Sequence, residues 1–284
     1  MPVDKYRPPP AHPLHPYIQA IFRIRLARPC ARETILPKGN VDLLFNLGDP
    51  LVGAATAEEG SVWVGGLRTA PYQVRATGTM DLLGVSLYAE GAAALVPLPA
   101  GELLNREAHG AEAIPGLGSL GDALRETAIF DAQRTLLVAW LLARLRPPRG
   151  AALVAQACAR LRESRAADPF RETASALAIS PRHLRRLITQ QVGVSPGEYL
   201  RLSRFIRSLH RLHAPHATIG RVAHAAGYYD HAHFCHDFRA IAGMTPQEYR
   251  AQPVRPAVGH VMGEGAPDAE REGPSSPGVG ARPG

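Results

Sequence analysis

The first hundred residues alternate short apolar runs with turn-forming residues. Runs such as IQAIFRI, VDLLFNLG, SVWVGGL and MDLLGVSLY are separated by Gly, Pro, Asn and Asp. Short apolar runs at this spacing are typical of β-strands, and several in succession favour a sandwich or a barrel. We therefore predict a β-rich region over residues 1–100.

The pattern changes to a helical period between Leu120 and Leu145. Apolar residues there recur at the spacing of one helix face with few helix breakers, which predicts one or two helices. Pro147, Pro148 and Gly150 then indicate a linker. We expect the helices to support the β-rich region within one molecule, or to form part of a dimer interface.

The end of the chain has little to bury. Residues 253–284 contain six prolines and seven glycines, a composition typical of disorder. The predicted organisation is an N-terminal β-rich domain at 1–146 with a helical segment at 120–146, a linker at 147–150, a second domain at 151–252 and a disordered tail at 253–284.

An internal repeat lies within residues 151–252. GVSPGEY at Gly193 to Tyr199 recurs as GMTPQEY at Gly243 to Tyr249, 50 residues later. RHLRRLI and AHFCHDF match in apolar pattern at the same offset. The chain therefore contains two copies of one unit.

Each copy has the pattern of a helix-turn-helix. An Ala-rich segment (FRETASALA or TIGRVAHAA) precedes a tight turn, and Ser180 or Asp230 can cap the helix that follows. On that helix Leu184 and Ile188 share one face and the arginines lie on the other, while Phe234 and Phe238 define the buried face in the second copy. The second helix of such a motif enters the DNA major groove.

The excess positive charge lies in the same region. The chain has a net charge of +7, and residues 151–252 hold 14 arginines against 7 acidic residues, whereas the remainder holds 18 basic and 18 acidic residues. A concentrated positive charge attracts a polyanion, most often nucleic acid. The charge distribution therefore favours DNA as the partner of the second domain.

Residues 151–252 resemble the DNA-binding domain of the AraC family of bacterial transcription regulators. The segment IGRVAHAAGYYDHAHFCHDFRAIAGMTPQEYR matches the C-terminal signature of that family nearly end to end. The resemblance implies an all-α domain of two helix-turn-helix units, joined by a long helix at about Ser195 to His213, that reads successive major-groove segments of double-stranded DNA. The DNA-contacting residues it implies are Arg182, His183, Arg185, Arg186 and Thr189 in the first unit, and His231, Ala232, His233, Cys235, His236 and Arg239 in the second. We expect the first unit to carry more of the sequence specificity.

The N-terminal half resembles a domain of uncharacterised function that precedes this DNA-binding domain in some family members. LPKGNVDLLFNLGDP and VGGLRTAPYQVRATG are among the segments that carry the resemblance. It implies a cupin-like β-barrel that senses a small molecule or mediates homodimerisation, in a regulator that would contact RNA polymerase if it activates. Candidate effector-binding residues are Trp63, Arg68, Tyr72 and Tyr88, since aromatic rings offer stacking area and arginine can hold an anion. The alternative is a regulator without a ligand, whose N-terminal domain makes only protein contacts.

Enzymatic and metal chemistry find little support. The sequence contains no GxSxG, HExxH or P-loop spacing, and before residue 150 its only histidines are His12, His15 and His109. The cluster GYYDHAHFCHDF spreads its histidines around a helix, so they do not converge as a zinc site requires. We predict no enzyme activity, no cofactor and no metal. A His231 and Cys235 pair, or a metal-binding or enzymatic barrel fused to a DNA-binding domain, is the alternative.

The sequence also predicts a cytoplasmic location. The N-terminal stretch MPVDKYRPPPAHPLHPY lacks the apolar core of a secretion signal, and no apolar run of the length of a membrane span occurs. Cys30, Cys158 and Cys235 show no CxxC spacing and are expected to be free thiols.

Overall fold

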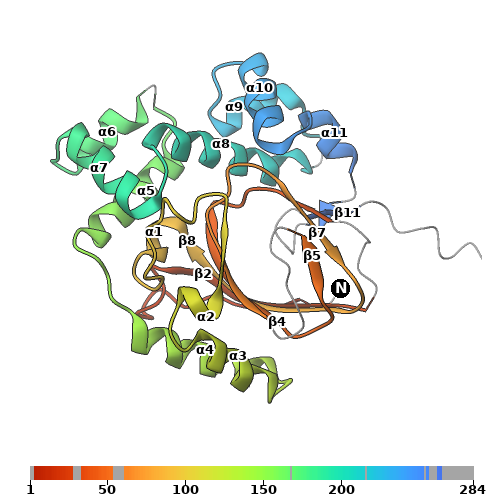
Figure 1. Cartoon of the computed structure of the whole chain (residues 1–284). Coiled ribbons are helices and arrows are strands. Elements are labelled where there is room, and N and C mark those ends of the chain that lie inside the picture. Colours follow the sequence, from red (N-terminus) through yellow and green to blue (C-terminus); the bar gives the residue numbers. More distant parts are fainter. Residues whose placement is uncertain are drawn as a thin grey trace, which may run out of the picture.

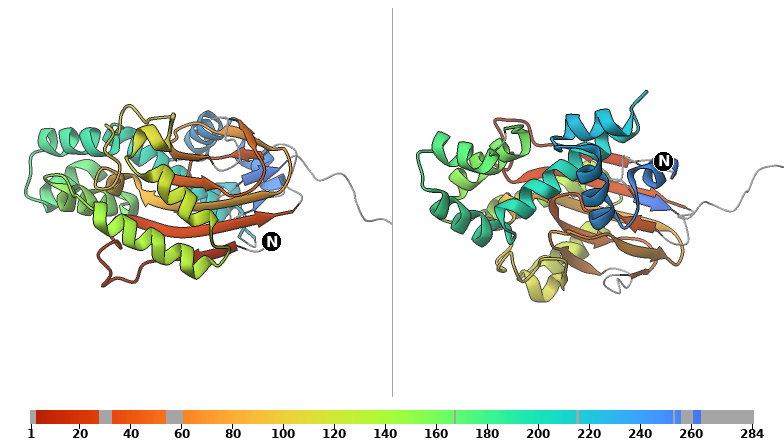
Figure 2. Two further views of the ribbon diagram at one scale, coloured as in Figure 1. Left: turned by 60° about the horizontal axis from the view of Figure 1, so that its bottom comes forward. Right: turned by 90° about the horizontal axis from the view of Figure 1, so that it is seen from above.

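In the computed structural model, a sheet-rich N-terminal part and a helical C-terminal part contact each other along one side (Figures 1 and 2). The structure describes residues 3–27, 33–53, 61–166, 168–214, 216–252, 254–255 and 261–263. Cys30 lies outside these residues. A continuous cluster of buried apolar side chains runs through both parts, from Leu14 to Tyr249. The two parts therefore share a core.

Two antiparallel sheets form the N-terminal part. The first has the strand order β1-β2-β8-β4-β6-β9, and the second has the order β10-β11-β3-β7-β5. The strands are β1 (Val3–Tyr6), β2 (Ile18–Leu26), β3 (Glu33–Ile35), β4 (Asn40–Asn46), β5 (Leu51–Gly53), β6 (Val62–Gly65), β7 (Tyr72–Ala76), β8 (Met80–Tyr88), β9 (Glu107–His109), β10 (Val254–Arg255) and β11 (Val261–Gly263). The predicted β-rich domain is confirmed. No strand pair among the described residues joins the two sheets, so they do not form a closed barrel.

Apolar side chains across the central strands hold the first sheet in register. Val85 on β8 lies opposite Ile21 on β2 and opposite Leu43 on β4, and all three are fully buried. Because side chains alternate between the faces of a strand, this register turns one row of apolar residues toward the interior. The rest of the core packs against this row of apolar side chains.

Part of the segment expected to be a disordered tail is ordered as strands. β10 pairs with β11, and β11 pairs antiparallel with β3, so that Met262 lies opposite Thr34. The C-terminal segment thereby adds two strands to the edge of an N-terminal sheet. Its composition hid this, because edge pairing uses backbone groups and needs little apolar sequence. The remainder of the tail lies outside the described residues.

Helices close the N-terminal part. They are α1 (Ala89–Ala92), α2 (Gly110–Ala113), α3 (Leu117–Arg125) and α4 (Phe130–Arg144). The buried amide of Gln133 on α4 accepts a hydrogen bond from Arg23 Nη1 at 3.0 Å, and Arg23 pairs with Asp81 at 2.7 Å. These bonds tie α4 to strands β2 and β8. The helical segment therefore supports the sheet within one molecule, which was the first of the two expectations for it.

The C-terminal part consists of helices arranged as two similar units. They are α5 (Ala151–Glu163), α6 (Pro169–Ala176), α7 (Pro181–Val192), α8 (Pro196–Leu212), α9 (Ile219–Ala226), α10 (His231–Ala242) and α11 (Pro246–Ala251). The pairs α6–α7 and α9–α10 are the two helix-turn-helix units, and the long helix α8 runs between them (Figure 1). None of the described helices is long and apolar enough to cross a membrane.

The same local signals begin and end the equivalent helices. Ser180 and Asp230 cap α7 and α10 by accepting hydrogen bonds from the amides three residues later. Gly193 and Gly243 end these helices at φ values of +85° and +75°, which favour glycine. Capping boxes then open α8 at Ser195 and α11 at Thr245. The sequence repeat is thus a structural repeat.

Candidate nucleic-acid interface

The first recognition helix, α7, buries one face and exposes the other. Leu184 and Ile188 are fully buried. The exposed residues are Arg182, Arg185, Arg186 and Thr189, and His183 is half-buried. Arg186 Nη2 lies 3.2 Å from His183 Nδ1, and the Arg185 guanidinium lies 5.8 Å from the Phe170 ring of α6. Two of the three arginines therefore have a neighbouring ring that restricts their orientation.

The second recognition helix, α10, is anchored by aromatic packing. Phe234 and Phe238 are fully buried, and the Phe238 ring lies 5.1 Å from Phe205 on α8 and 5.6 Å from Tyr249 on α11. The predicted contact residues lie outside this buried face: His231, Ala232, His233, His236 and Arg239 are exposed, and Cys235 is half-buried. The aromatic cluster therefore fixes which face of α10 points to solvent.

The histidines of α10 have separate partners. His231 Nε2 lies 3.6 Å from Cys235 Sγ, whereas His233 Nε2 lies 3.5 Å from Asp237 Oδ2. No group of three or more His, Cys, Asp or Glu side chains that could hold a metal ion occurs in the described part of the chain. The geometry favours a polar helix surface over a metal centre.

Tyr229 is a surface aromatic residue to which the sequence pattern assigned no role. It lies in the turn before α10 and is 93% exposed, whereas its neighbour Tyr228 is 4% exposed. Two adjacent tyrosines before a capping aspartate were the only signal, and that signal does not say which of the two faces solvent. The position of Tyr229 beside the start of α10 makes it a further candidate for DNA contact.

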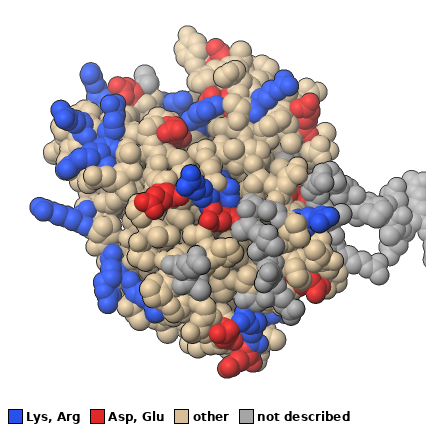
Figure 3. All heavy atoms as spheres, in the orientation of Figure 1, with Lys and Arg blue, Asp and Glu red and all other residues tan. Residues whose placement is uncertain are grey.

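Positive side chains gather on the helical part. Figure 3 shows Lys and Arg side chains mainly over α6 and α7 and along α8. An arginine-rich face of this kind can neutralise phosphates and can also donate paired hydrogen bonds to guanine. The positive charge of the helical part and the exposed arginine face of α7 thus both favour nucleic acid as the ligand.

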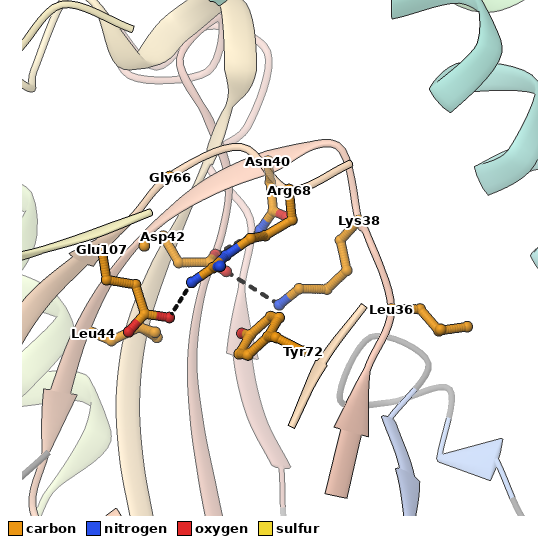
Figure 4. Close-up of a pocket in the computed structure, with 10 residues that line it drawn as sticks. Leu36, Lys38, Asn40, Asp42, Leu44, Gly66, Arg68, Tyr72 and Glu107 are labelled. Carbon is orange, nitrogen blue, oxygen red and sulfur yellow. Dashed lines mark hydrogen bonds and ion pairs between the residues drawn. The ribbon is translucent and has the colours of Figure 1, made fainter. Parts of the chain in front are cut away.

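A polar pocket lies in the N-terminal part. It is lined by Leu36, Lys38, Asn40, Asp42, Leu44, Gly65, Gly66, Arg68, Tyr72 and Glu107 (Figure 4). Lys38 pairs with Asp42 at 3.1 Å and Arg68 pairs with Glu107 at 2.5 Å. The Arg68 guanidinium lies 4.5 Å from the centre of the Tyr72 ring. Charged and aromatic side chains from separate strands and loops therefore converge on this pocket.

Two of the four predicted effector residues line the pocket and two do not. Arg68 and Tyr72 are lining residues. Trp63 instead packs in a small apolar cluster with Leu44 and Met80. The Tyr88 ring lies 5.2 Å from the guanidinium of Arg162 on α5, at the contact with the helical part. Trp63 lies opposite Leu44 and Tyr88 lies opposite Asn40, so both share a sheet face with lining residues, and their position on that face leaves them outside the pocket lining.

Burial changes the acid-base behaviour of the pocket. Burial raises the pKa of the Tyr72 hydroxyl to about 12. Burial acts to lower the pKa of Lys38, but the charge and hydrogen bond of Asp42, together with Tyr72, outweigh it and leave that pKa raised. At neutral pH the pocket therefore contains a neutral phenol beside a charged ammonium group.

The N-terminal part contacts the helical part through these elements. A Cβ added to Gly39, between the lining residues Lys38 and Asn40, would lie 2.7 Å from Ile206 Cδ1 on α8. Glu90 on α1 is buried and pairs with Arg162 on α5. The pocket is thus one residue away from a contact with the helix that joins the two units.

Comparison with known proteins matches both parts of the chain. A family model described as a helix-turn-helix domain matches residues 173–252, and one described as a domain of unknown function matches residues 6–109. The uncharacterised HTH-type transcriptional regulator YpdC of Escherichia coli K12 is 34% identical over 106 residues, which are 37% of this chain and 37% of YpdC. The HTH-type transcriptional activator RhaS of Escherichia coli O139:H28 is 32% identical over 77 residues, 27% of this chain and 28% of RhaS.

The chain therefore spans 37% of the length of YpdC and 28% of the length of RhaS. Among solved structures, ToxT from Vibrio cholerae is similar over 80% of this chain and 96% of ToxT, with a TM-score of 0.47 and 10% sequence identity.

Proposed function

We propose that the chain, whose residues 173–252 match a helix-turn-helix domain, is a sequence-specific DNA-binding transcription regulator of the AraC type. Its helices α7 and α10 enter successive major-groove segments on one face of double-stranded DNA. As a DNA-binding regulator it acts in the cytoplasm. It catalyses no reaction.

The duplicated unit is the observation that carries this proposal. Both copies have a capped recognition helix, a buried apolar face and an exposed polar face, and both end at a glycine with positive φ. A single exposed helix could be only a solvated surface. Two equivalent exposed helices on a positively charged domain are what a reader of two DNA segments needs.

Selection from random duplexes tests the proposal. The full chain should enrich a motif with two conserved segments about one helical turn, roughly 10 base pairs, apart. Binding to the enriched duplex should weaken steeply with salt, because arginine–phosphate contacts release counterions. Recovery of no motif would contradict sequence-specific reading. Motifs recovered in pairs would support a homodimer on DNA, which we include in the proposal together with contact to RNA polymerase if the protein activates.

We also propose that a small polar effector acts through the pocket of Figure 4. Two ion pairs and a tyrosine hydroxyl offer both donors and acceptors to such a molecule. The Gly39 contact with α8 supports a route from the pocket to the DNA-binding units. The competing proposal is a regulator whose N-terminal part makes only protein contacts. Thermal scanning against a metabolite library separates them, since a ligand of the folded state raises the melting temperature.

A further inference from the structure

Four arginines lie close together without acidic partners. They are Arg165, just after α5, and Arg204, Arg207 and Arg211 on α8. In the described part of the chain no carboxylate lies within ion-pair distance of any of the four, whereas Arg201 on the same helix pairs with Asp237 at 2.8 Å. We call these four residues the arginine cluster.

The arginine cluster faces away from the N-terminal part. Ile206 on α8 contacts Gly39 of the N-terminal part. At about 100° per residue, Arg204, Arg207 and Arg211 lie roughly 100–160° around the helix from Ile206. The N-terminal part therefore covers one face of α8 but not the arginine face, on which Arg204, Arg207 and Arg211 are half-buried.

The cluster lies between the two helix-turn-helix units. Arg207 Nη1 donates a hydrogen bond of 3.3 Å to the carbonyl of Ser164, four residues before the Asp168 cap of α6. On the other side, a Cβ added to Gly227, in the turn before α10, would lie 3.6 Å from Arg207 Nη2. Arg207 thus touches the start of the first unit and the turn of the second.

Among the described residues, two buried polar atoms, one in the cluster and one beside it, have no hydrogen-bond partner. These atoms are Arg207 Nε and Tyr228 Oη. The Tyr228 residue is almost fully buried. Buried polar groups in proteins are nearly always paired. Burial, followed by the charges of Arg165, Arg204 and Arg211, also lowers the pKa of Arg207. The uncompensated positive charge of the four arginines at one place is what an anion would relieve.

We propose that the arginine cluster binds a phosphate of the DNA backbone between the two major-groove segments, an inference that rests on the proposed function. Two recognition helices in successive major grooves are separated by about one helical turn, so the sugar–phosphate backbone between them faces the connecting element. That element is α8. Arginine suits this position because its fork of donors matches phosphate oxygens. The contact fixes the register of both helices on the duplex without reading a base.

Salt titration of charge-removing variants tests the inference on the full chain and the selected duplex. Arg204→Gln and Arg211→Gln remove charges that have no acidic partner, and Arg125→Gln removes an equal charge from α3 at the far end of the molecule. The slope of log K against log salt should become shallower by about 0.9 for each lost phosphate contact. The slope of Arg125→Gln should equal that of the unaltered chain.

Hydroxyl-radical footprinting adds the position of the contact. The double variant Arg204→Gln/Arg211→Gln should lose backbone protection between the two major-groove segments while keeping protection of guanine N7 within them, which methylation by dimethyl sulfate measures. Equal slopes and equal footprints for the double variant and Arg125→Gln would overturn the inference. If the unaltered chain selected no motif, the proposed function itself would fail first.

A free phosphate compound is the other source of the same chemistry. Pyrophosphate added to the protein without DNA serves as the probe. If pyrophosphate raises the melting temperature of the unaltered chain but not of the double variant, and the salt slopes are equal, the cluster is a small-anion site and the DNA contact is overturned. A shallower slope for the double variant supports the DNA contact.

Discussion

At the scale of single residues, the two recognition helices offer different chemistry to DNA. The exposed face of α7 carries Arg182, Arg185 and Arg186, whose guanidinium groups can bind guanine through two hydrogen bonds each. The equivalent face of α10 presents Ala232, with only a methyl group, and Cys235, a weak donor. We therefore expect the first unit to contribute more base discrimination and the second to contribute more through its position.

Arg186→Ala tests that expectation. The substitution should cost about 1–3 kcal/mol of binding at one base pair of the selected motif and relax the preference there, because a paired donor to a base edge is lost. Affinities for duplexes with each base at that position measure it. Arg186→Lys is the matched control, since lysine keeps the charge but not the planar fork. If lysine restored full binding, or if alanine weakened all duplexes equally, Arg186 would be a phosphate contact.

At the scale of elements, equivalent positions of the repeat have unequal surroundings. Gly193 and Gly243 end the two recognition helices at the same place in the repeat, and both have positive φ. A Cβ on Gly193 would lie 2.6 Å from the carbonyl oxygen of Ala100, whereas a Cβ on Gly243 would lie 3.8 Å from Pro71 Cγ. The first position therefore combines backbone strain with a steric clash, and the second has the strain alone.

Three glycine-to-alanine variants should separate these effects. Gly193→Ala should lower the free energy of unfolding by roughly 2–4 kcal/mol, and Gly243→Ala by about 1 kcal/mol. Gly197→Ala is the control, because a Cβ on this exposed helical residue would meet only Ser195 Oγ, at 3.9 Å. Its free energy of unfolding should rise by about 0.5–1 kcal/mol. Urea denaturation measures all three. Equal losses at Gly193 and Gly243 would refute the close approach of Ala100.

Local features of the helices could be predicted from the sequence, whereas features that depend on long-range contacts could not. Helix caps at Ser180 and Asp230 and the aromatic face of α10 depend on residues a few positions apart, and local pattern predicted them. The pocket depends on pairs such as Arg68 with Glu107, which are 39 positions apart and meet only after the sheet forms. For the same reason the pattern did not show which of the four candidate effector residues line the pocket, or that β11 pairs with β3.

At the scale of the whole molecule, the N-terminal part contacts both helix-turn-helix units at equivalent places. The loop at Ala100 meets the end of α7, and the loop at Pro71 meets the end of α10. The buried Glu90 adds an ion pair to Arg162 and lies 3.5 Å from the Tyr199 hydroxyl of α8. The two recognition helices are therefore held in one fixed arrangement, and a ligand that moved the N-terminal part would change that arrangement.

A fixed arrangement makes the spacing of the two DNA segments the decisive test. About 5 base pairs, half a helical turn, inserted between the segments of the selected motif would turn the second segment to the opposite side of the duplex. Affinity for the altered duplex should fall by about 100-fold or more, because lost base contacts cost about 1–3 kcal/mol each. An insertion of about 10 base pairs returns the second segment to the same side of the duplex but doubles its distance from the first. The protein should also bind this duplex weakly. Unchanged affinity for either duplex would contradict the reading of successive segments by two helices held in one fixed arrangement.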